Sequence, residues 1–225
     1  MSKAVLFSRA APAALCFSFF LAGCTGLFPQ DPAERLARAI NNNSASDIRE
    51  LLAEGFPTDY RTKTGRTPLM MAASKDAVDI IKVLLEHHAD INAREDKKQT
   101  ALHLAARWSD PATIRLLLRN GADPEARDYL SWTPLMWSCL QGREPAVAVF
   151  LEEGASLEGT DADGNTPLIL SAWRGQEGTA RLLLERGADP SRTNKHGMNA
   201  ADVADKNGFP ELSKMLRAGR PAPEG

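Results

Sequence analysis

The feature that most constrains this chain is a sequence unit that returns every 33 residues. The same interval separates Thr67, Thr100, Thr133 and Thr166 from one another, and Thr166 from Asn199, with no insertion or deletion. A fixed period in the range of about 20–50 residues is typical of repeat proteins, in which each unit packs mainly on its two neighbours. We therefore interpret the 225 residues as a stack of about six units.

Each unit carries the signals for two short antiparallel helices and a turn. Threonine is a good helix N-cap, and the proline after Thr67, Thr133 and Thr166 suits the first helical position. Small residues follow in the first helix and leucines in the second, which predicts an all-α fold with one elongated core. The second-helix leucines expected in the interior are Leu118, Leu151 and Leu184.

These motifs resemble the ankyrin repeat. Residues 100–106 and 187–190 match its Thr-Pro-Leu-His, small-residue and Gly-Ala-Asp elements most closely. The resemblance implies an ankyrin-repeat solenoid of about six helix-turn-helix units with β-turn tips. It also implies that His103 is a structural histidine that hydrogen-bonds between adjacent repeats. Lys98 and Ser131 replace the glycine before the threonine, so those two turns are expected to be less tight.

The period also predicts the domain boundaries. Asp31-Pro32-Ala33-Glu34 has the order of a helix N-terminus, with a capping acid, a proline in the first turn and a glutamate three residues on. Residues 220–225 are expected to be a disordered tail. The ankyrin-repeat domain is expected to span 33–219, with repeats at 34–66, 67–99, 100–132, 133–165 and 166–198 and a cap at 199–219.

The first 24 residues differ in character from the repeats. Lys3 and Arg9 are their only charged residues, and 13 uncharged residues follow at 10–22. As a helix these 13 residues would be about 20 Å long, too short for a hydrocarbon core of about 30 Å. A basic start, a short apolar segment and small residues before a cleavage point are typical of a secretory signal peptide.

The end of this segment, Leu21-Ala22-Gly23-Cys24, resembles the lipobox of bacterial lipoproteins. The resemblance implies that residues 1–23 are removed, that Cys24 is lipidated, and that 24–32 is a tether. Because Thr25 rather than aspartate follows the cysteine, it implies a lipid-anchored protein at the outer membrane of a bacterial cell envelope, facing the periplasm. The alternative is an ordinary secretory signal with an incidental cysteine.

Little in the sequence points to catalysis. Cys139 occupies a small-residue position where other units have alanine, so we interpret it as a buried core residue. His87 and His88 are adjacent and point in different directions, and no phosphate loop or Cys/His metal-ligand spacing is present. We expect neither an enzyme nor a metal or cofactor site. A net charge of −2 with 25% charged residues gives no indication of nucleic-acid binding.

Tryptophan is the residue whose distribution is most informative. All four, including Trp137, lie within 66 residues. The ankyrin resemblance places partner-facing residues in the turn before the threonine and seven and eight residues after it. These positions are Arg107, Trp108, Tyr129, Leu130, Trp132, Leu140, Gln141, Asn165, Trp173 and Arg174. The outer repeats place mainly basic residues at the same offsets: Lys63, Arg66, Ser74, Lys75, Lys195, His196 and Lys206. Scattered exposed apolar residues are the alternative interpretation.

The expected function is a membrane-anchored, monomeric module that binds a protein partner through the central aromatic surface. It would act as a scaffold for an envelope enzyme, or as an inhibitor or immunity-type protein. The alternative is a carrier of a cofactor or small ligand such as haem, with His103 or His196 as an iron ligand. The open surface of a solenoid favours a protein partner, because small-molecule sites are usually enclosed.

Overall fold

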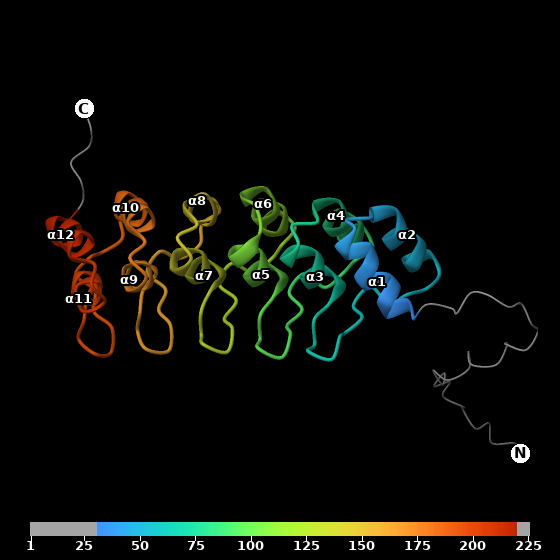
Figure 1. Cartoon of the computed structure of the whole chain (residues 1–225), viewed down its shortest axis with the longest axis horizontal. Helices are drawn as coiled ribbons and strands as arrows, with labels where there is room; N and C mark the ends of the chain where they lie inside the picture. Colours follow the sequence, from blue (N-terminus) through green and yellow to red (C-terminus); the bar gives the residue numbers. More distant parts are fainter. Residues whose placement is uncertain (1–30, 220–225) are drawn as a thin grey trace, which may run out of the picture. The chain divides into compact units, whose positions relative to one another are not determined.

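A computed structural model describes residues 31–219, and within them it contains twelve α-helices and no strand (Figure 1). The all-α prediction is confirmed for this part of the chain. The proposed signal peptide, Cys24 and the C-terminal tail lie outside the described residues. The helices are α1 Pro32–Asn41, α2 Ala45–Ala53, α3 Pro68–Ser74, α4 Val78–Glu86, α5 Ala101–Trp108, α6 Pro111–Arg119, α7 Pro134–Leu140, α8 Glu144–Glu152, α9 Pro167–Trp173, α10 Glu177–Glu185, α11 Ala200–Lys206 and α12 Pro210–Ala218.

The twelve helices of the described residues form six pairs, arranged in two rows (Figure 1). Helices α3, α5, α7, α9 and α11 contact one another in series, and α6, α8 and α10 do the same in the second row. The loops that join successive pairs all extend to the same side of the stack. This is the arrangement expected for a solenoid in which each unit buries its apolar side chains against its neighbours.

Helix starts follow the N-cap signals of the sequence. The hydroxyl oxygens of Thr67, Thr133 and Thr166 each accept a hydrogen bond from the backbone N–H three residues on, at 3.3–3.4 Å. Asp31 Oδ1 accepts from the N–H of Ala33 at 3.0 Å, and Pro32 is the first residue of α1. Asp31 thus caps α1 and Pro32 begins it, as the order of residues 31–34 predicts, and the expected tether of 24–32 overlaps this helix start by two residues.

The small residues of the first helices are fully buried, as expected from close packing between repeats; they include Ala72, Ala73, Ala105, Ala106, Cys139 and Ala172. In the second helices the inward-facing residues are Leu117, Phe150 and Leu183. Leu184 is also buried, but Leu118 and Leu151 are only partly buried. The prediction for those two leucines is wrong by one position, because successive helical residues point about 100° apart.

The turns at Lys98 and Ser131 are as tight as the turns that contain glycine. Both residues adopt left-handed backbone angles, with φ of 58° and 63°. Their N–H groups donate to the carbonyls of Glu95 and Asp128 at 2.8 and 2.9 Å, while Gly164 makes the equivalent bond at 3.1 Å. The expectation of looser turns is wrong: the backbone keeps the turn geometry and the side chains accept the left-handed conformation, at a local cost of about 1–2 kcal/mol.

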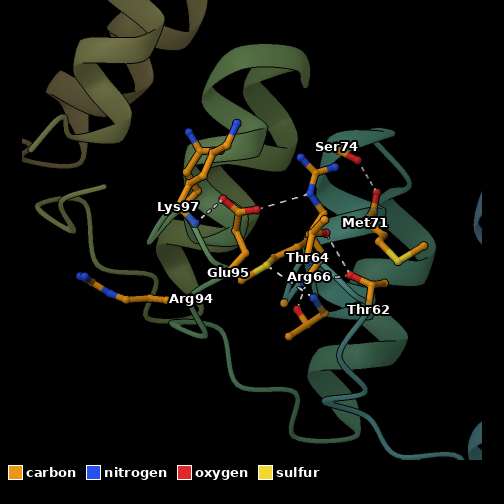
Figure 2. A network of polar contacts seen from close by, with 12 residues as sticks. Thr62, Thr64, Arg66, Met71, Ser74, Arg94, Glu95 and Lys97 are labelled. Atoms are coloured by element: carbon orange, nitrogen blue, oxygen red, sulfur yellow. Dashed lines mark hydrogen bonds and ion pairs between the residues drawn. The ribbon is translucent and has the colours of Figure 1, made fainter. Parts of the chain in front are cut away.

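A series of polar contacts joins each turn to the next. The residue just before each N-cap contacts the turn residue 29 positions later, as Arg66 does with Glu95 at 3.7 Å. Figure 2 shows the Glu95 carboxylate between Arg66 and the backbone of Lys97. Its Oε1 accepts a hydrogen bond from the Lys97 N–H at 3.2 Å. The later members are Gln99 with Asp128, Trp132 with Asp161, and Asn165 with Asn194. These contacts fix the turns in register along the stack.

Candidate functional site

A groove of about 530 Å³ lies on the turns and first helices of the C-terminal half of the stack. Its aromatic lining residues are Tyr129, Trp132 and Trp173. Ile169 and Leu170 of α9, both buried, line its base. The polar lining residues come from two successive turns and from the end of α11: Asp161, Asp163, Asn165, Asn194, His196, Lys206 and Asn207.

Two aromatic side chains of this groove are strongly exposed. Tyr129 is 55% exposed and Trp173 is 46% exposed, although each belongs to a residue type that usually buries most of its surface. They come from different repeats, Tyr129 from the turn before α7 and Trp173 from the last position of α9. The stacking of the repeats thus brings two exposed rings to the lining of one groove.

Trp132 lines the same groove but is only 7% exposed. Its indole N–H donates to Asp161 Oδ2 at 3.0 Å, and its ring lies 4.7 Å from that of Trp137, tilted by 60°. The prediction that Trp132 faces a partner as an exposed side chain is therefore wrong. This tryptophan takes the place of the polar residue that joins neighbouring turns elsewhere in the stack, and little of its surface is open to the groove.

Leu140 is a second expected partner-facing residue that the structure buries. It is 6% exposed and belongs to the core. It ends helix α7, and its carbonyl accepts a hydrogen bond from Gln176 Nε2 of the following repeat at 3.3 Å. The next repeat thus covers the position that the ankyrin resemblance assigned to a binding surface.

The remaining expected residues divide into two groups. Tyr129, Leu130, Asn165 and Trp173 line the groove. The other group lies outside it: Arg107, Trp108, Gln141 and Arg174. Trp108 is the most exposed of the large hydrophobic side chains, at 57%.

Sequence reasoning missed the C-terminal side of the groove. His196 and Lys206 line it, although their repeats were considered peripheral and basic. The signal was available in the period: Leu130, Asp163 and His196 are spaced by 33 residues and therefore occupy equivalent turn positions in adjacent repeats. Residues at one repeat position are neighbours in a solenoid, so a binding surface extends across them.

Arg107, Trp137 and Asp128 form a compact cluster beside the groove. The Arg107 guanidinium lies over the Trp137 ring at 4.2 Å and over the Trp108 ring at 5.2 Å. The Trp137 indole N–H donates to Asp128 Oδ2 at 2.9 Å, so this tryptophan supports the cluster from within the fold. Burial is the main cause that lowers the pKa of Arg107 below its usual value.

His103 has the structural role that the resemblance implied. Its Nδ1 accepts from the N–H of Thr100 at 3.1 Å, so Nε2 carries the ring hydrogen and donates to the Trp132 carbonyl of the next repeat at 3.1 Å. The side chain is fully buried, and this burial is the main cause that lowers its pKa. Both ring nitrogens are engaged, so His103 is not free to ligate haem iron.

Cys139 is fully buried, and burial raises the pKa of its thiol. The thiolate is the reactive form of cysteine, so this thiol is unsuited to nucleophilic catalysis. Within residues 31–219 no three His, Cys, Asp or Glu side chains are grouped so as to hold a metal ion. None of the helices described there is long and apolar enough to cross a bilayer.

Comparison with known protein families gives one match that covers most of the chain. A family model described as ankyrin repeats, in three copies, matches residues 36–128 and again residues 128–194. The two matches together include α2 to α10 and contain every residue of the groove up to Asn194.

Individual relatives match a shorter part. Ankyrin repeat, SAM and basic leucine zipper domain-containing protein 1 of Neofelis nebulosa is 35% identical over 72 residues, which is 32% of this chain and 15% of that protein. Its namesake in Dasypus novemcinctus is 36% identical over 75 residues, 33% of this chain and 16% of the relative. Probable E3 ubiquitin-protein ligase XBOS34 of Oryza sativa subsp. japonica is 37% identical over 65 residues, 28% of this chain and 13% of that protein. The likeness covers less than a fifth of each relative.

Proposed function

Because the chain belongs to the ankyrin-repeat family, we propose that it is a protein-binding module whose partner occupies the groove lined by Tyr129, Trp132 and Trp173. Ankyrin repeats imply a protein partner, and their stacked units offer a rigid, extended surface. The module would bind the partner without catalysing a reaction, as a scaffold or an immunity-type inhibitor does.

The observation that carries this proposal is the pair of exposed rings at one groove. Tyr129 and Trp173 are about half exposed, while the apolar residues Ile169 and Leu170 lie at the base. Binding energy in protein interfaces concentrates in a few residues, with tryptophan, tyrosine and arginine enriched among them. Rings held by helices and tight turns lose little conformational entropy when a partner binds.

We also propose that the module is anchored to a bacterial cell envelope through a lipidated Cys24. The support is the sequence Leu21-Ala22-Gly23-Cys24 and the charge pattern before it. Two or three acyl chains hold a protein stably at a membrane, whereas a single chain gives marginal binding. The partner would then be another component of the envelope, reached from the outer-membrane side of the periplasm.

Replacing Trp173 with alanine tests the binding proposal. We expect the variant to bind the partner at least about 2 kcal/mol more weakly, roughly a thirtyfold loss, because the ring supplies exposed apolar area at the groove. The partner would first be captured from envelope extract with the wild-type protein, and its affinity for each variant then measured by calorimetry. Lys63→Ala, an exposed change on an outer repeat, is the matched control. Normal binding by Trp173→Ala and Tyr129→Ala would rule out the groove.

Replacing Cys24 with alanine tests the anchor. The wild-type protein should incorporate a labelled fatty acid in bacterial cells and sediment with membranes, and the variant should do neither, because Cys24 is the only proposed acylation point. Repeat-domain folding, followed by circular dichroism, should be the same in both proteins. Equal labelling of Cys24→Ala and wild type would disprove lipidation at this residue.

A further inference from the structure

Arg107 carries a positive charge that the described part of the chain does not pair. Its guanidinium stacks on Trp137 and Trp108, and its Nε is buried without a hydrogen-bond partner. Among residues 31–219 no carboxylate oxygen lies within 4.0 Å of its side-chain nitrogens, the limit for an ion pair. Partly buried arginines in proteins are normally paired, because an unpaired charge away from water is unfavourable.

Asp128, the acid whose charge acts on Arg107, has its hydrogen-bonding capacity already filled. Its Oδ1 accepts from the N–H groups of Leu130 and Trp132 at 2.9 and 3.0 Å. Its Oδ2 accepts from Trp137 Nε1 at 2.9 Å and from Gln99 Nε2 at 3.4 Å. A carboxylate offers about four lone-pair sites, so Asp128 holds the turn together and has none left for Arg107. The N–H groups of the Arg107 guanidinium therefore have no acidic partner among the described residues and are available to a carboxylate from outside the chain.

Two adjacent tryptophan rings connect Arg107 to the groove. The guanidinium lies 4.2 Å from the Trp137 ring, and that ring lies 4.7 Å from Trp132, which lines the groove. The distance from the guanidinium to the Trp132 ring is therefore at most roughly 9 Å, which does not exceed the spacing of residues i and i+3 on one face of a polyproline II helix at about 3.1 Å per residue. An extended peptide of four residues can reach both points.

On the basis of the proposed function, we infer that the partner segment is an extended peptide that places an aspartate or glutamate on Arg107 and a large apolar side chain in the groove, with the two side chains at most three residues apart. Arginine matches a carboxylate with two parallel hydrogen bonds, and stacking on Trp137 holds its plane in place. The row of first helices continues past α5 to α3, so a bound chain has no need to end at Arg107; we assign an internal acidic side chain rather than a terminal carboxylate.

Short peptides test this inference on the full-length protein. The probes are end-blocked, fluorescein-labelled peptides with Glu-Pro-Pro-Phe or Phe-Pro-Pro-Glu at the centre, since the direction of the chain is open, each compared with its Gln counterpart by fluorescence anisotropy. We expect one order to bind wild type at least about tenfold more tightly with Glu than with Gln, because a hydrogen bond to a charged group is lost in the Gln peptide. We also expect that freeing the C-terminal carboxylate of the Gln peptide does not improve its binding over the same peptide with a blocked C-terminus.

Variants of the protein complete the test. Arg107→Gln should bind the Glu and Gln peptides within about twofold of each other, and Arg107→Lys should keep a reduced preference, because lysine retains the charge without the planar fork. Arg119→Gln, a change of an exposed arginine on α6, should keep the full preference. Thermal melts would verify that each variant is folded.

Three results would overturn the inference: no difference between Glu and Gln peptides on wild type, an unchanged preference in Arg107→Gln, or no binding of either order up to about 1 mM. Its failure is distinguishable from failure of the proposed function. If Trp173→Ala weakens the captured partner while Arg107→Gln does not, the groove is the binding site and the acidic specificity is wrong.

Discussion

Replacing Phe150 with alanine is expected to lower the free energy of unfolding by about 3–5 kcal/mol. Phe150 is among the largest fully buried side chains of the described residues, and it lies in α8, which contacts both α6 and α10. The substitution leaves a cavity between three consecutive repeats that helices fixed by their neighbours cannot fill. The loss combines the transfer of a phenyl ring with the cost of that cavity.

Urea denaturation of the full-length protein, followed by circular dichroism, measures this loss. In a solenoid each repeat is stabilised mainly by its contacts with the two adjacent repeats. Weakening the contacts of α8 should therefore also broaden or split the unfolding transition, because the repeats on either side would unfold less cooperatively. Leu151→Ala is the matched control: Leu151 is the next residue of α8 and only partly buried, so we expect less than about 2 kcal/mol. A larger loss for Leu151→Ala would mean that α8 turns its other side to the core.

The fold could be predicted from the sequence because each 33-residue unit carries the same helix-capping and packing signals at the same positions. A threonine cap, a proline at the next position and paired small residues recur in register, so agreement among units corrects a doubtful signal in any one of them. The turns at Lys98 and Ser131 illustrate this, since the fold imposes on them the left-handed angles that glycine adopts elsewhere. What the period could not decide was which of two adjacent apolar residues points inward, Leu117 or Leu118 and Phe150 or Leu151, because both members of each pair fit a buried helix.

The binding site was less predictable from the sequence, and Trp132 shows why. The position of a residue within the repeat predicts where its backbone lies, but the exposure of its side chain depends on which residues of the next repeat pack beside it. Asp161 accepts a hydrogen bond from the Trp132 indole N–H, and the tilted Trp137 ring packs against the Trp132 ring, so Trp132 becomes structural. Conversely, His196 and Lys206 belong to the groove because a later repeat stacks beside Trp173. Such pairings between units are properties of the packed solenoid.

Replacing Asp128 with alanine is expected to destabilise the protein by about 3 kcal/mol or more. The carboxylate is buried and accepts four hydrogen bonds, two from the backbone of its own turn and two from Trp137 and Gln99. Each buried donor left without an acceptor costs about 1–3 kcal/mol, and entry of water recovers part of the total. Since Trp137 loses its anchor, the variant should also bind acidic peptides more weakly through Arg107.

Two further variants separate hydrogen bonding from charge in the Asp128 result. Asp128→Asn keeps an oxygen for the N–H groups of Leu130 and Trp132 but turns an amide nitrogen toward the Trp137 indole, where two donors meet. Its loss of stability in urea denaturation should therefore lie between wild type and Asp128→Ala. Asp96→Ala removes an exposed acid from the preceding turn and should change stability by less than about 0.5 kcal/mol. If Asp128→Ala were no less stable than Asp96→Ala, the hydrogen bonds to Asp128 would not stabilise this turn. Asp128 would then have acceptor capacity to spare, and its hydrogen bonds would not explain why Arg107 lacks a partner among the described residues.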